Sequence, residues 1–415
     1  MDLREVYLMV TDHHYYTLED LRFNKNYGFL FSKEQFNEFV QLKDELVDNG
    51  KEYINKLNLK TFNSKHCFYV KGFYWLDLLE SYYSTAVEDF KQNDSFLIIR
   101  NLNDIISSRV FSEIEGTLSI ENIPTTRKRI SEIYRKAKLE DKNDIIIKNM
   151  LDAMQYIIVD KPPFTKENLR KLYDILSHDC LADEDKLPQG SYYRNDAVSI
   201  DGFEGADADK IDELMDSLFE FANNPDNIKQ HEDALPHICH YYILYVHPYF
   251  DYNGRTARMV SFWISYINNV TIAPYFISEA INENKFEYYK AIRNSRIMNN
   301  DLTYFLGYIM ESSIKFSLLY KNLEEIKKKF IGRGDFLTAT ELMYIKKILI
   351  HNADGYFNYK MFLEYIGGKM TKQGALKLLD RLVEYGILTK SQNKKKENIY
   401  KLEQSLIVYQ YSKKD

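Results

Sequence analysis

The twelve residues 247–258, with the sequence HPYFDYNGRTAR, bring together the side chains that phosphate chemistry requires. His247 is the group in this segment that can take up a proton near neutral pH. Asp251 offers a hard oxygen ligand for Mg²⁺, which commonly binds through one or two carboxylates together with phosphates. Arg255 and Arg258 lie three residues apart, so on a helix both guanidinium groups reach the same anion.

The elements on either side of this segment must position these groups. We expect helices over Leu235–Val246 and from Gly254 to Asn268, because Pro248 ends the first of them at about His247. The first turn of the second helix carries unsatisfied N–H groups at the positive end of a dipole, which suits a phosphate chain. Gly254 lets the backbone approach a ligand closely. A base, a metal ligand and an anion cradle together predict a phosphoryl- or nucleotidyl-transfer site.

This segment resembles the Fic family signature, H-P-F-x-D/E-G-N-G/K-R-x-x-R. The matching positions are His247, Pro248, Asp251, Asn253, Gly254, Arg255 and Arg258. The resemblance implies a helical fold and transfer of AMP from Mg-ATP to a Ser, Thr or Tyr hydroxyl of a target protein. It makes His247 the catalytic base and Asp251 the ligand of Mg²⁺. It assigns the phosphates of ATP to Asn253, Gly254 and Arg255, with Arg258 on the γ-phosphate.

The segment departs from the signature at two positions. Tyr249 replaces the usual Phe, which keeps an apolar anchor but adds a hydroxyl that needs a partner. Tyr252 replaces the first Gly and places a ring beside the phosphate cradle. The second change leaves open whether ATP or another donor, such as UTP, is used.

An upstream segment resembles the inhibitory-helix motif of the same family, S/T-x-x-x-E-G/N. Glu115 and Gly116 match it, although Phe111 stands where Ser or Thr is expected. The resemblance implies that Glu115 pairs with Arg258 and competes with the γ-phosphate for the same donors. The enzyme is therefore expected to be autoinhibited by Glu115, and Gly116 is expected to end its helix.

Two further segments fit the family. The stretch near 190–200, bracketed by glycines and prolines, resembles the flap on which a target segment docks as an added strand. Tyr288 and Tyr289 resemble a tyrosine pair at the adenine end of the pocket, and we assign Tyr289 to nucleotide binding.

Composition bounds the class of protein. The chain has 415 residues and a net charge of −6, which argues against nucleic-acid binding by the whole molecule. Its three cysteines are far apart and include no C-x-x-C pair, which indicates a reduced compartment, and no apolar run is long enough to cross a membrane. We therefore expect a cytoplasmic protein.

The fold expected is mainly α: a Fic-type helical core with a short β-hairpin flap, followed by a C-terminal winged helix-turn-helix. We expect an N-terminal helical region over 1–95, the catalytic core over 96–310 with the inhibitory helix near 103–116, and the winged helix over 335–411. The last contains three helical patterns, two strands and the basic turn Lys394–Lys396, which suits DNA or protein contact.

Several readings stay open. The same site could remove AMP from a modified target, with Glu115 activating a water. The protein could also be a DNA-binding regulator whose core only senses a nucleotide. A homodimer is neither required nor excluded. Zinc binding by His237, Cys239 and His240 is not expected, because no second pair completes a tetrahedral set.

Overall fold

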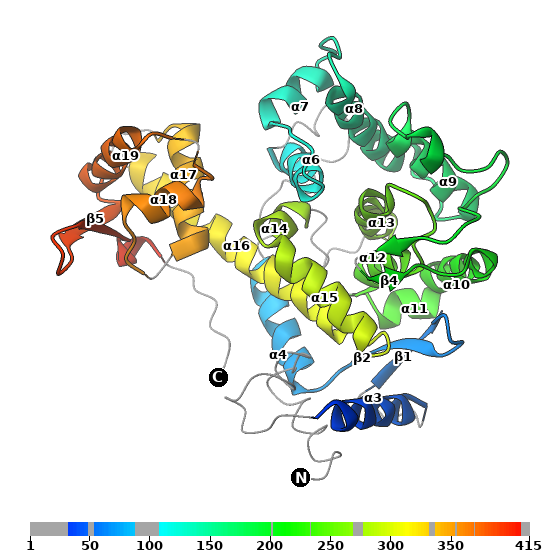
Figure 1. Cartoon of the computed structure of the whole chain (residues 1–415). Helices are drawn as coiled ribbons and strands as arrows, with labels where there is room; N and C mark the ends of the chain where they lie inside the picture. The colour runs from blue at the N-terminus through cyan, green and yellow to red at the C-terminus, as the bar shows by residue number, and fades with distance from the viewer. Residues whose placement is uncertain are drawn as a thin grey trace. The chain divides into compact units, whose positions relative to one another are not determined.

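The structure, a computed structural model, is mainly helical and forms two compact units, residues 1–313 and 314–415 (Figure 1). It describes residues 32–48, 54–87, 108–200, 202–232, 234–268, 277–331, 337–352, 355–368 and 370–407. Three antiparallel sheets of two strands each occur in these ranges. Helix α16 (Thr303–Ile331) contributes residues to both units. Within the described ranges, no helix has the length and apolar character to span a bilayer.

The first unit is built almost entirely of helices. They are α3 (Lys33–Asp48), α4 (Phe73–Tyr82), α6 (Ser108–Ile120), α7 (Arg127–Tyr134), α8 (Lys142–Gln155), α9 (Lys166–Ser177), α10 (Ile211–Asn223), α11 (Pro225–Gln230), α12 (Leu235–Val246), α13 (Asn253–Ile267), α14 (Ser278–Glu283) and α15 (Lys285–Ile297). Side-chain caps explain several starts: the Thr165 hydroxyl accepts from the backbone N–H of Asn168 at 3.3 Å, as the sequence predicted.

Helices α12 and α13 pack side by side at the centre of this unit (Figure 1). Helix α12 is apolar on nearly every face, and eleven of its twelve residues are buried. A helix that is apolar all round belongs in the interior. The predicted bounds of both helices are confirmed to within a residue, because Pro248 interrupts the chain between them.

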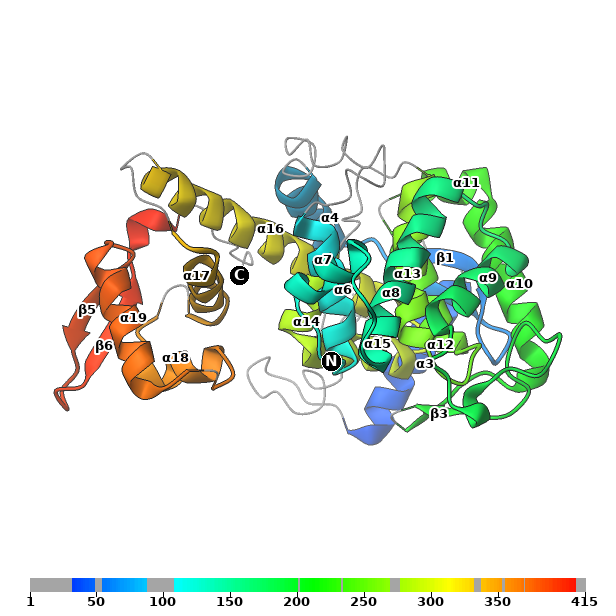
Figure 2. The same ribbon diagram turned by 90° about the horizontal axis from the view of Figure 1, so that it is seen from above.

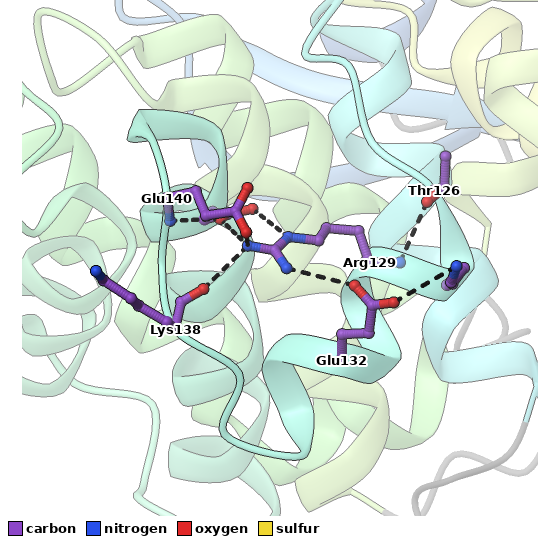
Figure 3. Close-up of polar contacts among 7 residues, drawn as sticks. Thr126, Arg129, Glu132, Lys138 and Glu140 are labelled. Atoms are coloured by element: carbon purple, nitrogen blue, oxygen red, sulfur yellow. Dashed lines mark hydrogen bonds and ion pairs between the residues drawn. The ribbon is translucent and has the colours of Figure 1, made fainter.

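Arg129 fixes the turn that joins α7 to α8 (Figure 3). Its Nε donates to Oδ1 of Asp144 at 2.8 Å, and its Nη2 donates to the carbonyl oxygen of Lys138 at 3.0 Å. Glu132 accepts from Nη1 at 3.3 Å. The hydrogen bond from Arg129 is the main cause that holds the pKa of Asp144 below its ordinary value. This ion pair therefore ties α7 to the first turn of α8.

A β-hairpin lies where the sequence predicted only helices. Strands β1 (Ile54–Lys60) and β2 (His66–Val70) pair in antiparallel fashion, and β2 also bonds to the segment after α15. The N–H of Leu302 donates to the carbonyl of Phe68 at 2.7 Å. The predicted helical character of 1–95 is thus wrong for 54–70, and residues 54–87 belong to the same unit as the core.

After α16, the described residues 337–407 of the second unit form three helices followed by a hairpin, as predicted. The elements are α17 (Ala339–Asn352), α18 (Tyr359–Tyr365), α19 (Lys372–Glu384), β5 (Leu388–Gln392) and β6 (Asn398–Leu402). Phe357, just before α18, exchanges two backbone hydrogen bonds with Tyr400 in β6, at 2.9 and 2.8 Å. Apolar side chains of all three helices, the hairpin and the later part of α16 form one core, which includes Leu323, Ile345, Phe362, Leu379 and Leu402.

Candidate active site

His247 terminates α12 in a left-handed conformation, with φ 54° and ψ 64°. Burial lowers the pKa of its imidazole to about 4, and the positive charges of Arg194 and Arg296 act in the same direction. A hydrogen bond with the backbone of Leu244 opposes this shift only in part. The ring is therefore neutral at pH 7, which is the form that accepts a proton.

Arg194 joins the flap, residues 190–205, to the loop that carries His247. Its buried guanidinium donates to four backbone carbonyl oxygens, those of His247 at 2.8 Å, Ala206 at 2.5 Å, Val246 at 3.5 Å and Asp196. Its own N–H donates to the carbonyl of Pro248 at 3.0 Å. Gly205 leaves room for this arrangement, because a Cβ there would lie 2.7 Å from Nη2 of Arg194. One side chain thus fixes the backbone on both sides of the imidazole.

Asn253 closes the loop between the two central helices. Its Nδ2 donates to the carbonyl of Tyr249 at 2.8 Å, and its Oδ1 accepts from the N–H of Tyr249 at 3.0 Å. The amide is therefore engaged within the loop, and the group that Asn253 offers to a phosphate is its backbone N–H at the start of α13.

The Tyr249 ring anchors the same loop by packing into the core against α9. It is fully buried and stacks on Tyr173, with ring centroids 3.8 Å apart. Its hydroxyl has no hydrogen-bond partner among the described residues. The hydrogen-bond partner expected for the Tyr249 hydroxyl is thus not found among the described residues.

Tyr252 shows why the family signature has glycine at this position. The residue caps α13 with φ 67° and ψ 6°, a left-handed conformation that glycine adopts without strain. Its buried ring lies under the Arg255 guanidinium, whose central carbon is 3.3 Å from the ring centroid. The substitution therefore holds Arg255 in place by a cation–π contact.

Asp251 is exposed at the mouth of the loop, where its Oδ1 accepts from the N–H of Tyr252 at 2.6 Å. Asp185 lies near enough that the charge of Asp251, after burial, raises the pKa of Asp185. Within the described ranges no group of three or more His, Cys, Asp or Glu side chains could hold a metal ion. A single carboxylate completed by substrate phosphates is the arrangement that suits Mg²⁺.

Glu121, which directly follows α6, forms ion pairs with both arginines of the signature, Arg255 and Arg258. Its Oε1 accepts from Nη2 of Arg258 at 2.5 Å, and its Oε2 lies 3.0 Å from Nε of Arg255. The Thr117 hydroxyl accepts from Nε of Arg258 at 2.6 Å. A Cβ at Gly254 would lie 2.8 Å from Oε1, so glycine permits this approach. Burial alone would raise the pKa of Glu121, but the two guanidinium charges lower it, and the carboxylate is ionised.

The predicted pairing of Glu115 with Arg258 is wrong. Oε2 of Glu115 lies 2.9 Å from Nε of Arg127, and Nη2 of Arg127 reaches Glu279 at 3.0 Å. Gly116 does not end the helix either: it lies inside α6, where a Cβ would approach the backbone N of Glu279 to 2.7 Å. Both residues serve the close packing of α6 on α14.

A second match to the inhibitory motif lies six residues downstream of Glu115 and Gly116. Thr117, Glu121 and Asn122 fit S/T-x-x-x-E-G/N at every specified position. The described helix α6 ends at Ile120, four residues beyond the expected end at 116, and residues 96–107 of the expected range lie outside the described part.

The flap is a short hairpin of β3 (Ser199–Ile200) and β4 (Phe203–Glu204). Its strands are shorter than the alternating run suggested, and residues 190–198 form a loop. Arg296 supports it, since its guanidinium lies 4.8 Å from the Phe203 ring centroid and donates to the carbonyl of Glu204 at 2.9 Å.

The tyrosine pair lies near the second signature arginine. Tyr288 is buried, and its hydroxyl lies 2.8 Å from Nε2 of His240; burial raises its pKa, and the nearby charge of Arg258 acts in the opposite direction. Tyr289 is 46% exposed and packs edge-on against Tyr288, with centroids 5.2 Å apart. Tyr289 therefore lies at the surface, and Tyr288 lies inside the core beside His240.

The Fic/DOC family model matches residues 163–265 of this chain, which include every signature position. A Fic family protein from Desulfovibrio desulfuricans is similar at 14% identity and a TM-score of 0.46, over 79% of this chain and 96% of that one. A Fic-1 fragment from C. elegans is similar at 16% identity and a TM-score of 0.46, over 60% and 73%. A Fic domain containing signaling protein from Bacteroides thetaiotaomicron is similar at 17% identity and a TM-score of 0.40, over 59% and 92%. None of the curated proteins matches the chain.

Proposed function

Because this chain is a Fic/DOC family protein, we propose that it transfers AMP from Mg-ATP to a Ser, Thr or Tyr hydroxyl of a target protein. The observation that carries the proposal is the meeting of a neutral His247, an exposed Asp251 and two helix-borne arginines around one loop. We further propose that Glu121 keeps this activity low.

In the proposed reaction the target hydroxyl oxygen attacks the α-phosphorus of ATP. A new oxygen–phosphorus bond forms, the bond from the α-phosphorus to the bridging oxygen breaks, and pyrophosphate leaves. His247 takes the hydroxyl proton as general base. Arg255 and the N–H groups at the start of α13 stabilise the charge on the phosphates. Asp251 would hold Mg²⁺, which when bound neutralises phosphate charge.

The inhibition follows from competition for the same donors. While Glu121 accepts a hydrogen bond from Arg258, that guanidinium is not available to the γ-phosphate, and the same carboxylate offsets the charge of Arg255. Removing the carboxylate frees both arginines and leaves His247 and Asp251 unchanged. The same carboxylate could activate a water for the reverse task, release of AMP from a modified target; that activity would disappear in Glu121→Gly.

The test is incubation with Mg²⁺ and ATP labelled at the α-phosphate, with a lysate as the source of targets. We expect little covalent label with the wild type and strong label with Glu121→Gly. The double variant Glu121→Gly/His247→Ala should lose the label again. Breaking a pair of ion pairs of this kind costs about 3 kcal/mol, so the increase should be on the order of 100-fold.

Glu115→Gly is the matched control, because Glu115 lies in α6, six residues before Glu121, and pairs with Arg127 instead. It should leave the label at the wild-type level. Equal labelling by the two glycine variants would overturn the assignment of Glu121. A folded Glu121→Gly protein that binds ATP and labels nothing, with UTP or GTP in its place as well, would overturn nucleotidyl transfer.

The flap is proposed as the docking site of the target. Strand β3 pairs only with β4 among the described residues, so its other edge can accept an extended peptide. Arg194 and Arg296 hold this hairpin beside His247, which would bring an added strand to the base.

We also propose that residues 337–407 form a winged helix. Supporting this, the elements follow the order of that fold: helix α17, a bridge at Phe357, helices α18 and α19, and the β5–β6 hairpin.

We propose a reducing, cytoplasmic location for the protein. The three cysteines are free and buried, which is consistent with such a compartment.

A further inference from the structure

The two units of the chain differ in the sign of their charge. Residues 314–415 contain 20 lysines and arginines against 11 aspartates and glutamates, whereas residues 1–313 contain 35 against 50. The net charge of −6 is thus the sum of an acidic unit and a basic one. Such asymmetry within one chain points to a polyanionic partner for the basic part.

One group of exposed basic side chains in the second unit lies on α19 and on the turn between β5 and β6, while Lys315, Lys328 and Lys360 are exposed on other helices. Lys372 and Lys377 are exposed on the first half of α19, together with Gln373. Lys394–Lys396 are exposed at the turn. In the part of the chain that the structure describes, neither Lys377 nor the lysines of the turn form an ion pair.

Acidic groups reduce this positive surface without cancelling it. Glu397 is exposed beside Lys396 in the turn, where its Oε2 accepts from Nδ2 of Asn393 at 2.9 Å. Asp380, on the outward side of α19, accepts from Nζ of Lys390 at 2.7 Å and from the Tyr400 hydroxyl at 3.2 Å. Glu384 is exposed in the last turn of α19. Arg381 adds nothing to the surface, because its Nε lies 3.1 Å from the buried Glu341. The uncompensated charge is therefore at the first half of α19 and at the turn.

The packing presents helix and turn together. Helix α19 faces the core with Ala375, Leu379 and Leu382, so its opposite face is turned outward. The ion pair from Lys390 in β5 to Asp380 places the hairpin beside that outward face (Figure 2). An exposed helix flanked by a basic hairpin suits a duplex whose groove and backbone are contacted at once.

We propose that residues 337–407 bind double-stranded DNA, with the first half of α19 in the major groove and Lys394–Lys396 on the phosphate backbone. A helix of roughly 10–12 Å diameter fits the B-form major groove of about 12 Å. The deep, narrow major groove of duplex RNA does not admit it. The proposal uses residues outside the Fic/DOC domain, so it stands or falls independently of the proposed function.

The test uses the full-length protein and a fluorescein-labelled 30-base-pair DNA of mixed sequence, with anisotropy measured from about 50 to 200 mM salt. We expect binding that weakens steeply with salt. In Lys394→Ala/Lys395→Ala the slope of log affinity against log salt should fall by about 2, since each phosphate contact contributes about 0.9. Lys377→Ala should weaken binding as well.

Lys327→Ala/Lys328→Ala is the matched control, because it removes the same charge from α16, where both lysines pair with glutamates. Its salt slope should equal that of the wild type. An equal loss in both double variants, no binding at 50 mM salt, or equal binding of duplex RNA would overturn the proposal. So would competition by polyglutamate or by anionic lipid vesicles at the same charge concentration as DNA.

Discussion

The two sides of the catalytic loop are held in different ways. On the base side, Arg194 donates to main-chain carbonyls around His247, which are permanent parts of the fold. On the anion side, Arg255 and Arg258 are held by the Glu121 carboxylate. A phosphate can replace a carboxylate on a guanidinium, whereas no substrate replaces a buried carbonyl.

This difference separates regulation from chemistry. In the proposed mechanism, inhibition acts on the anion that the two arginines bind, whereas Glu121 makes no described contact with His247, whose pKa is lowered mainly by burial. Loss of Glu121 can therefore raise activity without rebuilding the base. Loss of Arg194 should have the opposite consequence, since nothing else described in the flap reaches the His247 carbonyl with a side chain.

The largest expected effect comes from Arg194→Met, measured in the Glu121→Gly background. We expect kcat to fall about 100-fold, because a misplacement of about 1 Å at the reacting group has this effect. Arg194→Lys should recover only part of the rate, since one ammonium cannot reach the carbonyls that the planar guanidinium reaches. The pKa of His247, followed by NMR, should rise from about 4, because a neighbouring positive charge that lowers it is gone.

Arg170→Met is the matched control. Arg170 is partly exposed and donates to the carbonyl of Ser191 and to Asp174, rather than to the carbonyl of His247. It should change kcat little and leave the His247 pKa where it is. A purely structural role for Arg194 would instead lower the melting temperature in both variants and move neither the His247 pKa nor the rate per folded molecule.

The next effect concerns the anion side, through Thr117→Val. The hydroxyl of Thr117 accepts from Arg258 at 2.6 Å, and a hydrogen bond to a charged group contributes about 1.5 kcal/mol. We expect basal labelling to rise about tenfold, with no further increase when Glu121 is already glycine. Ser119→Ala on the same helix should change neither value. An additive effect of Thr117→Val and Glu121→Gly would mean that Thr117 does not act through the inhibited state.

The difference between the two sides also decides what the sequence could reveal. The loop and its flanking helices were predictable because their signals are local: Pro248 ends α12, and Gly254 with two arginines marks the start of α13. Thr165 likewise announced the start of α9. The two arginines that face the anion, Arg255 and Arg258, could be predicted from their spacing of three residues on one helix.

Features that depend on distant segments were missed. Arg194 lies 53 residues from His247, and nothing near it in sequence distinguishes it from a surface arginine. The β1–β2 hairpin has its partner at Leu302. Glu115 and Gly116 match the end of the inhibitory motif in sequence, but Gly116 instead leaves room for the backbone of α14, which the local sequence does not reveal.

A smaller effect should separate the ring of Tyr252 from its hydroxyl. In the Glu121→Gly background, Tyr252→Gly should raise KM for ATP about fivefold, because a cation–π contact of about 1 kcal/mol no longer holds Arg255. Tyr252→Phe keeps the ring over Arg255 and should leave KM unchanged. A KM that rises equally in both variants would assign the effect to the hydroxyl, which lies against Cys180.

The smallest effect is a change in stability. It concerns Tyr249, which lies in the loop between His247 and the two arginines. Its hydroxyl is buried without a partner among the described residues, so Tyr249→Phe removes a desolvated polar group and keeps the stacked ring. We expect the free energy of unfolding to rise by about 1 kcal/mol, measured by urea denaturation. Tyr242→Phe provides the comparison of opposite sign, because the Tyr242 hydroxyl donates to the carbonyl of Lys60 at 2.7 Å and its loss should destabilise the protein by a similar amount. If both changes destabilise equally, the Tyr249 hydroxyl has a partner such as an ordered water, and the loop is held by one more polar contact than its protein groups supply.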